Sequence, residues 1–150
     1  MDSLSLTIFE DRSLFDGAST SVVREHFKQW AITAPQQEQS TGPALSQRYR
    51  YCIQVDDAAL KSVLENDEPL PPMSHGFVNL IWNDDGWKHT NGAPSPEEEE
   101  VEEPIEGCTW HNVGWMRVTY QDVMVCFYVL LRDLNDCHRV YRRPPEVAHG

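Results

Sequence analysis

The sequence predicts an α+β domain in which a mainly antiparallel β-sheet of about five strands has two helices packed on one face. Two kinds of pattern lead to this prediction. Several short segments alternate apolar and polar residues, which is typical of strands with one buried face, and two segments place apolar residues at helical spacing. The chain of 150 residues is long enough to bury one core without disulfides or structural metal, so we expect residues 1–150 to form a single domain.

The first third of the chain predicts a strand, a helix and a linker. In residues 4–9 (LSLTIF), leucine and isoleucine alternate with polar residues, as in a half-buried strand. Residues 19–33 carry an apolar stripe at helical spacing, and either Ser19 or Ser21 can cap this helix by accepting a hydrogen bond from a free backbone N–H. Residues 34–46 (APQQEQSTGPALS) are polar and interrupted by proline and glycine, so they predict a mobile linker.

The middle of the chain predicts a strand, a short helix, a second strand and an acidic loop. Residues 48–55 (RYRYCIQV) alternate, and Asp56 or Asp57 can cap the short helix that follows. Prolines end this helix, and residues 76–82 (GFVNLIW) then predict another strand. Residues 90–107 are turn-rich and then acidic, and because like charges repel one another we expect a flexible, solvated loop.

The last third of the chain is the most apolar. Residues 113–120 (VGWMRVTY) alternate and predict a strand. Residues 123–131 (VMVCFYVLL) are all apolar, which fits either a strand buried on both faces or a buried helix. Their β-branched and aromatic residues favour the strand, whereas Thr119 and Asp122 have the spacing of a helix capping box. A last short element precedes two prolines that close the fold.

The net charge of −12 is concentrated in one place, because seven of the 24 acidic residues lie within residues 97–106. No lysine-rich face offsets this acidity, so non-specific binding to nucleic acid is not expected. No apolar run reaches the roughly 18 residues of a membrane span, and the N-terminus lacks the basic and apolar regions of a secretory signal. Four irregularly spaced cysteines do not form a disulfide framework. We therefore expect a cytoplasmic protein with free thiols, with the nucleus as the alternative compartment.

Cysteine and histidine pairs are the candidates for a metal or catalytic site. Cys108 and His111 have C-x-x-H spacing, and Cys137 is followed directly by His138. Four such ligands could hold zinc tetrahedrally, but a paired C-x-x-C knuckle is absent and adjacent strand residues point apart. No metal is therefore favoured and no cofactor is expected. A cysteine nucleophile would need a histidine base and a third group to orient it, so the catalytic residues stay unassigned.

The first functional hypothesis is a soluble intracellular protein-interaction or regulatory domain without catalysis. It rests on the absence of the common nucleotide-binding, serine-hydrolase and zinc-protease motifs and on the local acidic segment. The expected partner is a protein, with a second copy of the chain as an alternative, and neither nucleic acid nor a membrane is expected. The candidate interaction residues are Arg48, Arg50, Glu97, Glu98, Glu99 and Glu100.

The second hypothesis is a small enzyme or small-molecule-binding domain with a pocket between the sheet and the helices. This hypothesis requires an enclosed pocket with at least two converging polar groups. The candidate lining residues are His26, Trp30, Tyr49, Tyr51 and Trp115.

Overall fold

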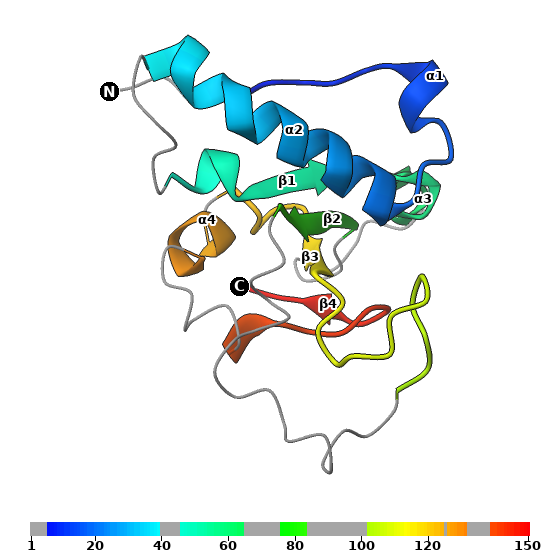
Figure 1. Ribbon diagram of the computed structural model, residues 1–150. Helices are drawn as coiled ribbons and strands as arrows, with labels where there is room; N and C mark the ends of the chain where they lie inside the picture. The colour runs from blue at the N-terminus through cyan, green and yellow to red at the C-terminus, as the bar shows by residue number, and fades with distance from the viewer. Residues whose placement is uncertain (1–5, 40–45, 65–75, 84–101, 125, 132–138) are drawn as a thin grey trace.

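The strands form one mixed sheet (Figure 1). The computed structural model describes residues 6–39, 46–64, 76–83, 102–124, 126–131 and 139–150. In these residues the strands are β1 (Tyr51–Gln54), β2 (Phe77–Trp82), β3 (Trp115–Thr119) and β4 (Val147–Ala148), in that order across the sheet. The β1–β2 and β2–β3 pairs are antiparallel and the β3–β4 pair is parallel. The α+β class is confirmed, whereas the described sheet is mixed and has four strands.

The helices are α1 (Arg12–Phe15), α2 (Thr20–Gln39), α3 (Asp57–Leu64) and α4 (Cys126–Leu130), with a 3-10 turn, η1 (Gln47–Tyr49), before β1. Figure 1 shows α2 running alongside β1, with which it is in contact. The helices predicted at residues 19–33 and after Asp56 are confirmed, and so are caps for both. Ser19 Oγ accepts a hydrogen bond from the backbone N–H of Val22 (3.4 Å), and Asp56 Oδ1 accepts one from that of Ala59 (2.7 Å).

The two faces of the sheet differ in polarity. The predicted strands at residues 76–82 and 113–120 are confirmed as β2 and β3, whereas residues 48–55 contain part of η1 as well as β1. Residues directly opposite each other on antiparallel strands have side chains on the same face. One face carries a row of three polar residues, Gln54, Asn79 and Arg117, and is called the polar-row face. The other face carries Ile53, Leu80 and Met116 in the neighbouring row.

Helices approach both faces of the sheet, whereas the sequence predicts helices on one face. On the polar-row face, Gln54 Nε2 donates to the carbonyl of Ala18 (3.1 Å), just before α2, and Asn79 Nδ2 donates to Asp56 Oδ2 (2.8 Å), just before α3. On the other face, Tyr51 Oη donates to the carbonyl of Leu131 (3.4 Å), just after α4. The extra helix α4 accounts for this difference.

The core lies between these layers. Its fully buried apolar side chains include Ile81, Met116, Val118 and Phe127. In the part of the chain that the structure describes, no helix is both long and apolar enough to cross a membrane.

The last turns of α2 occupy part of the segment for which the sequence predicts a linker. Residues 34–39 are helical although Pro35 lies among them, and proline inside a helix costs about 3 kcal/mol. Tertiary contacts offset this cost. Pro35 is itself buried, and Glu38 accepts hydrogen bonds from Arg48 Nη2 (2.7 Å) and Tyr49 Oη (2.9 Å). Most of the remaining predicted linker lies outside the described residues.

The contact of Glu38 with Arg48 predicts a pH-dependent stability. Hydrogen bonds from Arg48 lower the pKa of Glu38 from 4.5 to about 2. A carboxyl whose pKa is lowered by folding stabilises the fold above its unfolded pKa, and this contribution is lost as the pH falls through about 4.5 towards 2. We expect the Glu38→Gln variant to be less stable than the wild type near neutral pH and to differ less as the pH falls through this window.

Urea unfolding at a series of pH values measures this difference. Glu25→Gln on the exposed side of α2 is the matched control. A gap between wild type and Glu38→Gln that is as wide at low pH as at neutral pH would contradict the assignment of the ion pair.

The N-terminal segment does not form the strand predicted at residues 4–9. Its described part, residues 6–10, has no regular structure, and residues 1–5 lie outside the description. Leu6 and Ile8 are exposed, so the alternation of the sequence does not correspond to a buried face. A strand needs a neighbouring strand for its backbone hydrogen bonds, and within the described residues β1 pairs with β2 alone.

Residues 123–131 contain a turn and α4 instead of the preferred strand. Thr119 Oγ1 donates to the carboxylate of Asp122, and the carbonyl of Thr119 accepts the backbone N–H of Val123 (3.2 Å). These contacts correspond to the helical alternative indicated by the Thr119–Asp122 spacing. Phe127 and Leu131, four residues apart, are both buried, as expected for one face of a helix. Tertiary packing therefore outweighs the strand propensity of the valines and aromatics.

Candidate functional site

A tight hairpin closes the end of the acidic segment. The backbones of Ile105 and Cys108 exchange hydrogen bonds of 3.0 and 2.9 Å around Glu106 and Gly107. Both turn residues have positive φ, +49° and +81°, as in the two-residue turn that matches the twist of paired strands. The hairpin brings the two chain segments on either side of it back together.

Glu106 at this turn fastens the hairpin to α2. Its carboxylate accepts hydrogen bonds from the backbone N–H of Thr20 (3.1 Å), from Thr20 Oγ1 (2.6 Å) and from Ser21 Oγ (3.0 Å). Burial raises the pKa of Glu106, but the hydrogen bonds from Thr20 and Ser21 outweigh it and lower the pKa overall. A negative charge at a helix N-terminus is stabilising. The described end of the acidic segment is therefore anchored to the fold.

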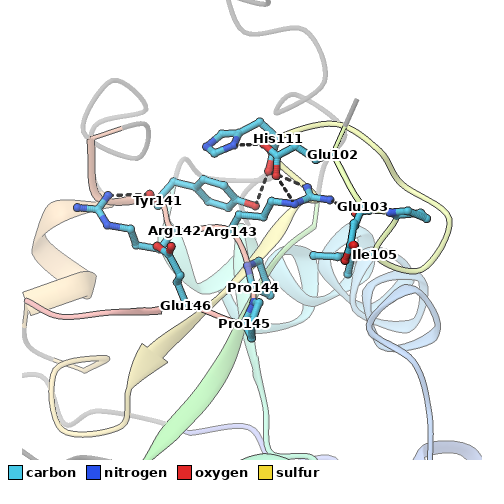
Figure 2. Close-up of a pocket in the computed structure, with 11 residues that line it drawn as sticks. Glu102, Glu103, Ile105, His111, Tyr141, Arg142, Arg143, Pro144, Pro145 and Glu146 are labelled. Atoms are coloured by element: carbon cyan, nitrogen blue, oxygen red, sulfur yellow. Dashed lines mark hydrogen bonds and ion pairs between the residues drawn. The ribbon is translucent and has the colours of Figure 1, made fainter. Parts of the chain in front are cut away.

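A hollow of about 640 Å³ lies between this hairpin and the C-terminal segment (Figure 2). Glu102 lies there between His111 and Arg143. Its Oε1 is 2.6 Å from His111 Nδ1 and its Oε2 is 2.6 Å from Arg143 Nε. A carboxylate in this position orients an imidazole ring, as it does in many catalytic and metal sites.

The guanidinium of Arg143 is fully used inside the chain. Besides Glu102, it donates to the carbonyls of Glu103 (2.6 Å), Cys108 (3.5 Å), Trp110 and His111 (3.1 Å). These contacts occupy the five donors of the guanidinium. Arg143 therefore ties the 102–111 segment to the C-terminal segment and has no donor left for a ligand.

Tyr141 also holds the loop that contains His111 against the C-terminal segment. Its Oη donates to the carbonyl of His111 (3.0 Å) and accepts the backbone N–H of Val113 (3.1 Å). Burial raises the pKa of Tyr141 to about 12, so the phenol stays protonated near neutral pH. The cluster in Figure 2 thus positions a loop, and His111 is its exposed member.

The predicted metal candidates divide between described and undescribed residues. Cys108 lies in the hairpin and His111 pairs with Glu102. Cys137 and His138 lie outside the described residues. Where the structure describes the chain, no group of three or more histidine, cysteine, aspartate or glutamate side chains is arranged to hold a metal ion.

A second and larger hollow, the α2 groove, has a volume of about 1,790 Å³. It is lined by residues 6–10, by one side of α2, by residues 51–58 and by apolar side chains between residues 123 and 131. Several of these side chains are large, apolar and exposed. They are Leu6, Ile8, Phe9, Ile53, Val55 and Met124.

Aromatic rings line one part of the α2 groove. His26 lies between the rings of Phe9 and Phe15, at centroid distances of 5.2 and 5.1 Å. Phe9 also packs edge-on against Trp30 at 5.9 Å. The guanidinium of Arg48 lies over the ring of Trp30, 5.4 Å from its centroid.

The structure brings three of the predicted pocket residues to one place. His26, Trp30 and Tyr51 line the α2 groove. Tyr49 is buried beside Trp30, and Trp115 is buried in the core on β3. The sequence assigns other lining residues to secondary structure: Phe9 ends the predicted first strand and Val55 ends the second. The alternation of apolar and polar residues in these two segments was the available signal that apolar side chains share one side of each segment.

The predicted interaction residues are placed in part. Arg48 bonds to Glu38 and donates to Thr7 Oγ1 (2.6 Å), and Arg50 lies over the ring of Tyr51, 5.3 Å from its centroid. Glu97, Glu98, Glu99 and Glu100 lie outside the described residues.

Comparison of the chain with protein-family models, with curated proteins and with solved structures gives no match.

Proposed function

We propose that this chain is a non-catalytic protein-interaction domain whose α2 groove binds an apolar, basic segment of a partner protein. The observation that carries the proposal is that several large apolar side chains line the groove and remain exposed, such as Ile8, Ile53 and Val55. Contiguous exposed apolar surface is costly in water and commonly marks a binding surface.

The charge of the α2 groove supports a basic partner. Five carboxylates line it in the described residues, against one arginine and one histidine. Glu38 is paired with Arg48 and Asp16 with Arg12, and the other three carboxylates attract cations. The five are Glu10, Asp16, Glu38, Asp56 and Asp57.

The polar groups of the α2 groove support binding over catalysis. Arg48 and Gln54 bond to groups of the same chain, and His26 lies between aromatic rings. Burial raises the pKa of the Cys52 thiol to about 12, so this lining cysteine is not a nucleophile near neutral pH. The small-molecule alternative requires polar groups that converge on an enclosed ligand, and these groups are engaged elsewhere.

Binding of a labelled peptide of alternating lysine and valine, KVKVKVKVK, tests the proposal by fluorescence anisotropy. We expect this peptide to bind, its acidic counterpart EVEVEVEVE to bind at least tenfold more weakly, and the affinity for the basic peptide to fall with added salt.

Two matched double variants locate the site. Ile53→Ser with Val55→Ser removes apolar groups that are 43% and 61% exposed inside the α2 groove. Val22→Ser with Ile32→Ser removes groups that are 43% and 64% exposed outside it. We expect the first pair to weaken binding about tenfold or more, since each loss of a buried apolar side chain costs roughly 1 kcal/mol, and the second to leave it unchanged. If the two double variants bound the basic peptide with equal affinity, the proposal would be refuted.

A further inference from the structure

The N-terminal segment, residues 6–10, forms one wall of the α2 groove and is called the strap. All five of its residues line the hollow, and so do the residues of β1. The strap runs along α2 towards α1 (Figure 1), and its rings contact those of α2. A segment bound in the α2 groove would therefore lie against both the strap and β1.

Side chains fasten the strap to its neighbours. Thr7 Oγ1 accepts a hydrogen bond from Arg48 Nη2 (2.6 Å), and the ring of Phe9 packs edge-on against those of His26 and Trp30. All five strap residues are exposed and lie outside the helices and strands. Segments with exposed backbone and few packed contacts open at a low cost in free energy, so the strap can leave α2 without unfolding the domain.

The short helix α1 keeps the strap attached when it opens. Asp11 caps α1 by accepting the backbone N–H of Ser13 (2.9 Å), directly after the strap. Phe15 at the end of α1 packs against His26, with 5.1 Å between the ring centroids. This contact involves no strap residue, so α1 stays on α2 when Thr7 and Phe9 detach.

The strap offers apolar surface to whatever binds in the α2 groove. Leu6 and Ile8 line the hollow and are 64% and 71% exposed. Covering apolar side chains stabilises a complex in proportion to the area removed from water. An apolar partner segment in the groove would be stabilised by covering Leu6 and Ile8 as well as Ile53.

We infer that the strap is a lid on the α2 groove, which opens to admit the partner segment and closes over it. Leu6 and Ile8 then lie against apolar side chains of the partner, and Thr7 and Phe9 hold the lid to Arg48 and α2. This inference rests on the proposed function and adds the way in which access to the groove is controlled.

Limited proteolysis with chymotrypsin measures the opening of the lid. This protease cleaves after aromatic residues in accessible chain, so cleavage after Phe9 reports the open strap. We expect saturating KVKVKVKVK, which has no aromatic residue, to slow this cleavage at least tenfold. Hydrolysis of a small chromogenic substrate with the same peptide present is the control for inhibition of the protease. Unchanged or faster cleavage after Phe9 would overturn the lid, because a strap that the peptide displaces would be cut more readily.

The anchor at Thr7 is tested in the protein without peptide. Thr7→Val keeps the shape of the side chain and removes the acceptor for Arg48. We expect cleavage after Phe9 to become about threefold faster, as for the loss of one exposed hydrogen bond. A rate equal to that of the wild type would contradict the anchored strap.

A double variant tests the contact between the lid and the partner. Leu6→Ser with Ile8→Ser removes exposed apolar groups, and we expect it to bind KVKVKVKVK about tenfold more weakly than the wild type. The pair Val22→Ser with Ile32→Ser outside the groove is again the matched control, with unchanged affinity expected.

The outcomes separate the lid from the proposed function. If the Leu6 and Ile8 changes left the affinity unchanged or raised it while the Ile53 and Val55 changes still weakened binding, the lid would be refuted and the groove retained. If the Ile53 and Val55 changes had no effect, both would be refuted. Sedimentation of the protein alone and with peptide tests a second copy as the occupant. A dimer that the peptide dissociates would overturn both the proposed partner and the lid that admits it.

Discussion

Replacing Phe127 by alanine is expected to lower the free energy of unfolding by about 3–5 kcal/mol. The ring is 1% exposed and belongs to the core formed by the sheet and α4. Alanine would leave a cavity that close-packed neighbours fill only in part. Urea unfolding measures the loss, provided that the variant keeps the wild-type dependence on urea.

Val129→Ala is the control for this variant. Val129 is two residues away on α4 and 62% exposed, so its truncation is expected to change stability by less than about 0.5 kcal/mol. Residues two apart lie on the same side of a strand but on different sides of a helix. Similar losses for the two variants would therefore indicate the strand that the sequence favours here and would contradict α4.

Replacing Arg143 by methionine is expected to cost about 3 kcal/mol, because hydrogen bonds from a charged group contribute roughly 1.5–3 kcal/mol when their loss leaves partners unpaired. The variant would leave the carboxylate of Glu102 with His111 alone and would release the carbonyls of Glu103 and Trp110. Thermal or urea unfolding measures the effect. Limited proteolysis within residues 102–111 is expected to become faster in the same variant.

Two further substitutions check this interpretation. Arg143→Lys keeps the charge without the planar fork and is expected to recover less than half of the loss. Arg142→Met removes an exposed neighbour that donates to the nearby carbonyls of Arg139 and Tyr141, and a change below about 0.5 kcal/mol is expected. If Arg142→Met lowered the free energy of unfolding as much as Arg143→Met, the role assigned to the guanidinium of Arg143 would be contradicted.

The elements that depend on local pattern were predictable. The helix from Thr20 has an apolar stripe with a serine cap, and Asp56 caps α3 through a hydrogen bond within one turn. Both signals involve residues close in sequence, so they do not depend on contacts with distant parts of the chain. β2 and β3 were predictable for the same reason, since each is a short run rich in apolar residues.

Elements that depend on distant partners were not predictable. Residues 34–39 read as a linker because nothing local offsets Pro35, whereas Arg48 and Tyr49 stabilise that end of α2 through Glu38. The alternation at residues 4–8 indicates a strand, but it does not supply the neighbouring strand that such a segment needs.

The candidate site shows the same division. Aromatic and histidine residues were recognised as lining candidates, and His26, Trp30 and Tyr51 do meet in the α2 groove. The sequence contains no signal that Tyr49 and Trp115 are buried elsewhere, or that Phe9 reaches across to α2. These positions follow from how the layers pack.

The sequence by itself determined the α+β class, the start of α2 and its capping serine, and the strands β2 and β3, because each follows from residues within a few positions of one another. The tertiary structure alone decided the length of α2, the helical state of α4 and the docking of Glu106 on Thr20. It also decided that β1 and the N-terminal segment line one hollow, the α2 groove, together with one side of α2. These features depend on contacts between residues far apart in the chain, and such contacts can outweigh local propensities worth about 1 kcal/mol or less per residue.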